Sequence, residues 1–187
     1  MKPFHASDTA TIEFISPGLY EITLEVQDDD GGVSAVDVPK LITGNEFCSR
    51  SQGFWKHQFS GKGKPHFRED TLQRYLDLVS EASGYFGEVI SLDNIESADR
   101  VMNPKGPDKL EKAEAQLLAA WLNFTDGSVA WDEIVQIEDG TTLSVGEALV
   151  QVESMLSDPH STDADFVKAL EIAESVNLQD EGNSSCD

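Results

Sequence analysis

The side chains best suited to binding or chemistry lie together in one stretch, from Cys48 to Phe59. This stretch combines aromatic rings with a cysteine, a histidine and cationic side chains, in a chain that is otherwise acidic. Such rings either fill the core where a helix starts or form an exposed platform on which a sugar ring stacks. We expect most of the stretch to fill the core. The position of Lys56 also predicts a cation–π contact with the ring of Trp55 or Trp121.

The platform hypothesis would make the chain a carbohydrate-binding module. Its exposed tryptophans would stack on the rings of the glycan. The residues expected to contact such a ligand are Trp55, Lys56, His57, Trp121 and Trp131.

The chain has two cysteines, Cys48 and Cys186. We predict a disulfide between them, which requires an oxidising compartment and closes a loop long enough to stabilise the fold by about 4–5 kcal/mol. Two unrelated free thiols are the first alternative. A zinc site that adds His57 and His66 is the second.

Sequence signatures of catalysis are absent. The chain has no Gly-x-Ser-x-Gly, His-Glu-x-x-His, P-loop or Gly-x-Gly-x-x-Gly pattern, and its four histidines show no ligand spacing. Paired carboxylates are too common in this chain to indicate a site. We therefore expect a protein without catalytic activity, with a secreted hydrolase as the less favoured alternative.

The charge is strongly negative. Asp and Glu number 35 against 13 Lys and Arg, which gives a formal net charge of -22. Such a surface repels phosphate backbones and anionic lipid, so nucleic acid and membrane surfaces are excluded as partners. It favours calcium, a basic protein, or the strong salt of a halophilic environment. Residues 40–74 nevertheless hold seven of the 13 cations. This basic strip either receives an anionic ligand such as an acidic polysaccharide or neutralises the chain's own carboxylates, and we favour the second.

No segment is predicted to enter a membrane. The longest apolar run, residues 117–122, is far shorter than the roughly 20 residues that a spanning helix needs. Residues 1–5 lead into polar sequence, so we expect no signal peptide, and the first strand begins so abruptly that the chain resembles a piece of a longer protein.

Residues 8–43 alternate in the manner of β-strands. About three strands are expected, with a turn at residues 28–32, an edge or exit at Pro39 and a linker at residues 41–45. The turn contains Asp28, Asp29 and Asp30, which favour turn geometry and could alternatively ligate calcium.

This segment resembles the last third to half of a PKD domain. The likeness rests on Pro17-Gly18-Leu19-Tyr20, on Ile22-Thr-Leu-Glu-Val26 and on Asp28-Asp-Asp-Gly31. It implies part of an antiparallel immunoglobulin-like sandwich of a secreted or surface protein, whose usual role is a spacer or a contact module for protein or carbohydrate. A whole sandwich needs about seven strands, so other domains or neighbouring chains are the expected partners of the open edges.

The remainder of the chain shows helical periodicity. Ser144 and Glu147 form a capping-box pattern, and Pro107 is expected in the first turn of its helix. Asn123-Phe-Thr and Asn183-Ser-Ser match the glycosylation acceptor pattern. Residues 131–143 are expected to form a small β-hairpin, with helix as the alternative for their first part. The helices are expected at residues 68–82, 93–102, 107–123, 144–157 and 162–177.

Two blocks in this region resemble a secreted bacterial and archaeal helical domain. Ser49-Arg-Ser-Gln-Gly-Phe-Trp-Lys-His57 is similar to its opening "TQGYWKNH" signature, and residues 115–127 are similar to its "QLLAAKLN…G" helix. His57 and Gln58 stand where the signature has Asn and His. The resemblance implies a fold and a location outside the cell but no reaction.

The sequence thus predicts an α+β protein. A partial antiparallel Ig-like β unit occupies residues 1–43, and a mostly α-helical domain with a small β-hairpin occupies residues 44–187. The expected function is that of a non-catalytic structural or adhesion module, extracellular or at the cell surface, with no cofactor unless calcium binds.

Overall fold

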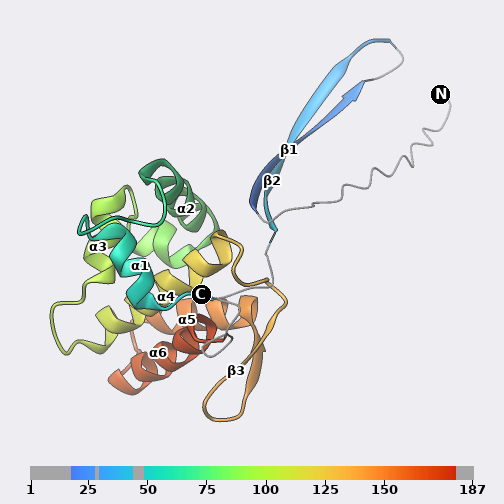
Figure 1. Cartoon of the computed structure of the whole chain (residues 1–187). Coiled ribbons are helices and arrows are strands. Elements are labelled where there is room, and N and C mark those ends of the chain that lie inside the picture. Colours follow the sequence, from blue (N-terminus) through green and yellow to red (C-terminus); the bar gives the residue numbers. More distant parts are fainter. Residues whose placement is uncertain (1–17, 28–29, 44–48, 180–187) are drawn as a thin grey trace.

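The structure is a computed structural model that describes residues 18–27, 30–43 and 49–179 (Figure 1). It is mostly α-helical, with two separate antiparallel strand pairs. Strands β1 (Gly18–Gln27) and β2 (Val33–Thr43) form the first pair and precede the helices that the structure describes. Strands β3 (Ile134–Gln136) and β4 (Thr142–Ser144) form the second pair, between two helices.

The β1–β2 hairpin differs from its prediction at Pro39. Ile22 pairs with Val38 and Tyr20 pairs with Leu41, so the register shifts between these pairs. Pro39 lies in this irregularity, where its missing N–H breaks no regular ladder bond. The strand therefore continues past the proline to Thr43, so an exit at Pro39 and a linker that starts at residue 41 were wrong. The edge alternative agrees with the described sheet, in which β2 pairs only with β1.

The Ig-like unit of about three strands is not confirmed. Its expected first strand, residues 8–14, lies outside the described residues. Within the part of the chain that the structure describes, β1 and β2 pair only with each other.

All five predicted helices are confirmed within two residues at each end, and the small hairpin is confirmed as β3–β4. A short π-helix, η1, follows α2 and was not predicted. The helical elements are α1 (Gln52–Phe59), α2 (Glu69–Ala82), η1 (Tyr85–Val89), α3 (Ile95–Met102), α4 (Lys109–Thr125), α5 (Val145–Ser157) and α6 (Asp163–Asn177).

Local capping explains where these helices begin. Glu147 N–H donates to Ser144 Oγ at 3.2 Å, and Ser144 N–H donates to the Glu147 carboxylate at 2.8 Å, which completes the predicted capping box of α5. At α4 the cap is Asp108, whose carboxylate accepts the N–H of Leu110 at 2.9 Å. Pro107 therefore lies just before the helix rather than in its first turn.

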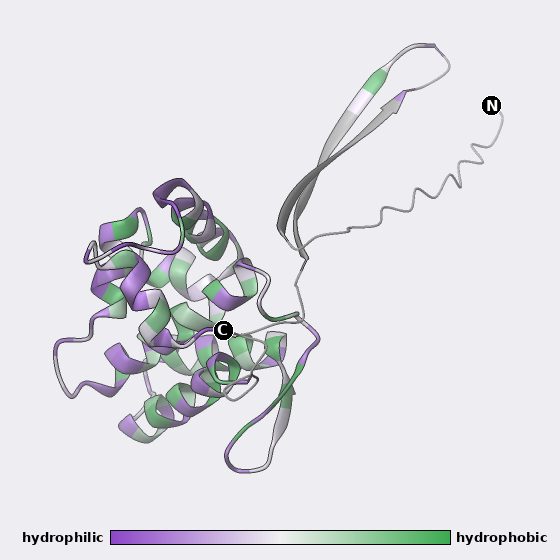
Figure 2. Ribbon diagram, viewed as in Figure 1, coloured by the Kyte–Doolittle hydropathy of each residue, from purple (hydrophilic) through white to green (hydrophobic). Residues whose placement is uncertain are grey.

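The core forms around α4, which packs against α1, α2, α3, α5 and α6. Six consecutive residues of α4, Leu117 to Leu122, are buried, because other helices cover this helix on several sides. Figure 2 shows apolar and polar positions alternating along the surrounding helices, as expected where each turns one face to the core. Within the described ranges, no helix combines the length and apolar character that crossing a bilayer requires.

Candidate functional site

Helix α1 directs the tryptophan of the aromatic stretch into the core. Ser51 caps the helix, because its hydroxyl accepts the N–H of Phe54 at 3.3 Å. Trp55 has no exposed surface, and its ring stacks on Phe67 with centroids 5.5 Å apart and planes 9° from parallel. Trp55 therefore fills the core, as expected for most of the stretch, and offers no ring face to a sugar.

Arg50, rather than Lys56, makes the cation–π contacts of this region. Its guanidinium carbon lies 4.6 Å from the ring centroid of Phe54 and 5.4 Å from that of Phe67. Lys56 is exposed, and the predicted contact with Trp55 or Trp121 was wrong. Adjacent residues of a helix point in different directions, so Lys56 cannot reach across the ring of Trp55 beside it.

The guanidinium of Arg50 also pairs with a buried carboxylate. Arg50 Nε lies 3.2 Å from Asp126 Oδ2, and the Asp126 side chain is only 4% exposed. Burial raises the pKa of Asp126, and hydrogen bonds from Ser128 and the charge of Arg50 partly offset that effect. The ion pair therefore fixes the segment before α1 to the end of α4.

The amide of Asn123 joins three distant parts of the chain. Asn123 Oδ1 accepts the indole N–H of Trp55 and the backbone N–H of Arg50, both at 2.9 Å. Asn123 Nδ2 donates to the Arg50 carbonyl at 2.8 Å and to Asn177 Oδ1 at 2.9 Å. Asn177 in turn donates to the carbonyl and side-chain oxygens of Gln116. We call Arg50, Trp55, Asn123 and Asn177 the Asn123 junction.

Asn123 is buried, and its amide uses two donors and two acceptor positions within the junction. The Asn123-Phe-Thr triplet is consequently no glycosylation site in the folded chain, because an acceptor amide must be accessible. The second triplet, at Asn183, lies outside the described residues.

A second buried indole is held by a carboxylate. Trp121 Nε1 donates to Glu153 Oε1 at 2.8 Å, and Ser83 Oγ donates to the same oxygen at 2.5 Å. The N–H of Gly84 donates to Glu153 Oε2 at 3.2 Å. Trp121 is only 2% exposed, so it also belongs to the core and not to a binding platform.

Trp131 differs from the other two tryptophans, because 46% of it is exposed. Its ring lies 5.3 Å from Phe124 and 6.2 Å from Trp121. It also covers Gly146, where an added Cβ would lie only 2.2 Å from Trp131 Cε2. Glycine at this position allows the ring to lie against α5 with its outer part in solvent.

The structure therefore does not bring the five predicted ligand residues together. Trp55 and Trp121 face the core, whereas Lys56 and His57 are exposed on α1 and Trp131 is exposed between α4 and β3. The prediction had treated the three tryptophans alike, and only Trp131 keeps the exposure that stacking needs.

The metal and disulfide predictions lie largely on residues outside the described ranges. Cys48, Cys186, Asp28 and Asp29 are among these, so the disulfide and the calcium site remain predictions. Asp30 is exposed beside the turn. Among the described residues, no group of three or more His, Cys, Asp or Glu side chains is arranged to hold a metal ion.

A cleft of about 500 Å³ between α3 and the start of α4 was not predicted. It combines apolar walls with charges of both signs, including Arg100, Lys105, Glu111 and Glu114. The hydroxyl of Tyr85, which is buried, donates to Glu114 Oε1 at 2.6 Å.

The pKa values of Tyr85 and Glu114 are both raised above their ordinary values. Burial is the largest cause that raises the pKa of Glu114; the hydrogen bond from Tyr85 opposes it, and the charges of Glu111 and Asp108 add to it. Burial and Glu114 together raise the pKa of Tyr85. The pair is an acid–base candidate because Glu114 lines the cleft and bonds the hydroxyl of Tyr85. The signal in the sequence was a carboxylate beside the apolar residues of α4.

A second cleft, between β3 and α6, is lined by Glu138, Glu171, Glu174 and Gln179 among others. All of its ionisable lining residues are acidic, so the cleft extends the negative surface of the chain. No protein-family model, curated protein or solved structure matches this chain.

Proposed function

We propose that the chain is a non-catalytic structural or adhesion module of an extracellular or cell-surface protein. The observation that carries the proposal is that the polar atoms of the core side chains bond to other groups inside the protein. Trp55, Arg50 and Trp121 direct their polar atoms to Asn123, Asp126 and Glu153, and so connect helices rather than present a site. Side chains committed to such bonds stabilise a fold and are poorly placed to bind a substrate.

The Asn123 junction also supports the proposed disulfide. Arg50 follows Cys48 by two residues, and Asn177 precedes Cys186 by nine. Both Arg50 and Asn177 form hydrogen bonds with the side chain of Asn123. The segments that lead from these two residues to the cysteines therefore both begin next to Asn123. Nine residues can span far more than the separation a disulfide requires. A covalent bond there would suit an oxidising exterior.

The β1–β2 hairpin supports the role of the module in a larger assembly. An isolated two-stranded hairpin is marginally stable in water, so further strands are expected to complete it. We assign these strands to the rest of an Ig-like unit, supplied by another segment of the protein or by a neighbouring chain.

The absence of catalysis is best tested at the Tyr85–Glu114 pair. The full chain is assayed against panels of ester, glycoside and peptide substrates, with Glu114→Gln as the matched variant. We expect no turnover by either protein. Turnover that Glu114→Gln abolishes without loss of folding would overturn the proposal and assign a hydrolase. Intact mass spectrometry without reductant tests the disulfide, and two free thiols would contradict it.

A second candidate function, a carbohydrate-binding module, is favoured by the exposure of Trp131 alone. A glycan array should compare the natural chain with Trp131→Ala and with Val150→Ala, which also removes an exposed apolar side chain. Binding lost only in the Trp131 variant would favour this function. Trp55→Ala is unsuitable as a test, because it would open the core.

A further inference from the structure

The described cations between residues 50 and 74 do not, for the most part, neutralise the chain's own carboxylates. Arg50 pairs with Asp126, and Arg68 pairs with Asp70 at 3.1 Å between two exposed side chains. Among the described residues, Lys56, Lys62, Lys64 and Arg74 form no ion pair. Direct ion pairs therefore do not account for the neutralisation that we favoured from the sequence at these four side chains.

Five of the basic side chains in this region come from α1 and the loop after it. We call Lys56, His57, Lys62, Lys64 and His66 the α1 basic surface. All five residues are exposed. The sequence from residue 47 to residue 68 contains no Asp or Glu, although the chain has 35 of them. The charge of this stretch is therefore positive, whereas the chain as a whole is negative.

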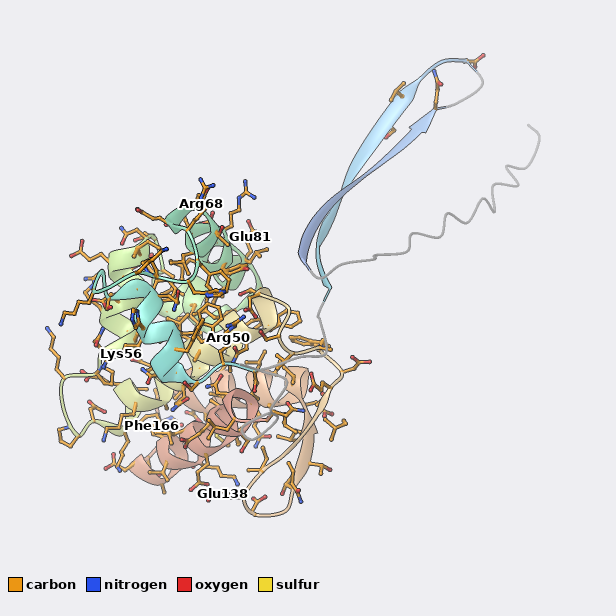
Figure 3. All side chains as sticks on the ribbon, viewed as in Figure 1. Arg50, Lys56, Arg68, Glu81, Glu138 and Phe166 are labelled. Atoms are coloured by element: carbon orange, nitrogen blue, oxygen red, sulfur yellow. The ribbon has the colours of Figure 1, made fainter. Side chains whose placement is uncertain are left out.

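The loop is folded back onto α1 rather than extended. The side-chain oxygen of the buried Gln58 accepts the N–H groups of His66 at 2.7 Å and of Phe67 at 3.2 Å. Gly63 adopts a φ of +79° and lies against His57, since a Cβ there would be 3.3 Å from His57 Cε1. This geometry places Lys62 and Lys64, on either side of Gly63, beside the exposed end of α1. Lys56, which Figure 3 labels beside α1, is one of these exposed side chains.

Aromatic surface lies next to these charges. The ring of His66 packs 6.1 Å from Phe54 and 5.0 Å from Phe67, and the residue remains exposed. A half-buried ring cluster with lysines around it can contact the C–H face of a sugar ring while it pairs with carboxylates. The surface thus matches an anionic sugar better than a neutral one.

We propose that the α1 basic surface binds an anionic polysaccharide with one carboxylate per sugar, a polyuronate. The proposal deepens the structural or adhesion function and rests on it. Such a polymer is favoured over duplex nucleic acid or an anionic membrane, because these carry charge at higher density and the net charge of -22 repels them more. Binding would be reversible and weakened by salt, since exposed charge pairs are screened.

The experiment measures binding of polygalacturonate to the full chain by calorimetry at increasing NaCl. Two double variants are compared, Lys62→Gln with Lys64→Gln, and as a control Lys105→Gln with Lys109→Gln, which removes two exposed lysines outside the α1 basic surface. We expect the first to weaken binding roughly fivefold to tenfold and the control to stay within about twofold. Equal effects of both double variants, or no binding at low salt, would overturn the proposal.

Three further arms identify the ligand class. They use neutral dextran, single-stranded DNA, and vesicles that contain anionic lipid. Binding to any of these as tight as to polygalacturonate would overturn the choice of a polyuronate. Reducing ends are counted in the same mixtures. Their release would contradict the non-catalytic function and leave binding intact, whereas absent binding without release would reject only the further inference.

Discussion

The Asn123 junction and the α1 basic surface place polar side chains of one helix in opposite situations. At the junction, the indole N–H of Trp55 meets a buried amide whose bonding capacity is used completely. On the other side of α1, Lys56 and His57 are exposed. Buried polar groups must be paired inside the protein, whereas exposed ones are paired with water until a ligand replaces it. The comparison separates side chains that hold the fold from those that can act outside it.

The largest loss of stability is expected when Asn123, whose amide joins the parts of the Asn123 junction, is replaced by alanine. Asn123→Ala leaves the indole N–H of Trp55, the N–H and carbonyl of Arg50 and the amide oxygen of Asn177 without their partner. Because each unsatisfied buried group costs about 1–3 kcal/mol, we expect the free energy of unfolding to fall by about 3–5 kcal/mol. Denaturant titration measures the change.

The control for this prediction is Asn103→Ala. Asn103 is half-buried, and its side-chain amide donates only to Asp99, four residues earlier. Its replacement should cost less than about 1 kcal/mol. Similar losses for both asparagines would show that the Asn123 junction has no special role in stability.

Two ion pairs of arginine, one buried and one exposed, test the same comparison, and we expect smaller losses of stability from them than from Asn123→Ala. Arg50→Gln leaves the buried carboxylate of Asp126 without its cation, although Ser128 N–H still donates to it at 3.0 Å. We expect a loss of about 2 kcal/mol, because one partner of a largely buried pair is removed. Arg68→Gln breaks a pair whose side chains are 84% and 61% exposed, and should cost less than about 0.5 kcal/mol. Thermal unfolding in low and high salt distinguishes them, and equal losses would contradict the assigned burial.

Glu114 is half-buried, and its effect on stability should depend on pH. Burial is the main cause of its raised pKa, so the folded state binds this proton more tightly than the unfolded state. Its contribution to stability is complete below the unfolded pKa of about 4.3 and is lost as pH rises through the folded value. Glu114→Gln keeps an acceptor for Tyr85 and removes this dependence.

The Glu114→Gln variant should therefore gain stability relative to the natural chain as pH rises from about 4 to 7. Paired denaturant titrations across this range provide the measurement. A difference that stays constant with pH, or that has the opposite sign, would show that the folded state does not raise the pKa of this carboxyl.

Much of the fold was predictable, because local chemistry determines where the helices start and end. Ser144 with Glu147 and the apolar spacing around Leu117 identify α5 and α4 within two residues. The junction was not predictable, since the partners of Asn123 lie 73, 68 and 54 residues away in sequence. Only tertiary packing brings such partners together.

The candidate site was predicted less well, for two different reasons. The mistaken contact of Lys56 could have been avoided, because helix geometry separates it from its neighbour Trp55. The exposure of Trp131 could not have been read from residue type, since Trp55 and Trp121 are buried. The basic strip was recognised, but whether its lysines met carboxylates of the same chain depended on the path of the loop after α1.

The bond between Asn123 and Asn177 has a consequence for biosynthesis. The ribosome delivers Arg50 and Trp55 long before α6, so Asn177 can reach the amide that Arg50 and Trp55 share only after α6 has been made. If the chain ended before α6, the surface of α4 that α6 covers would be exposed to solvent. The helical body is thus completed only after α6 has been translated.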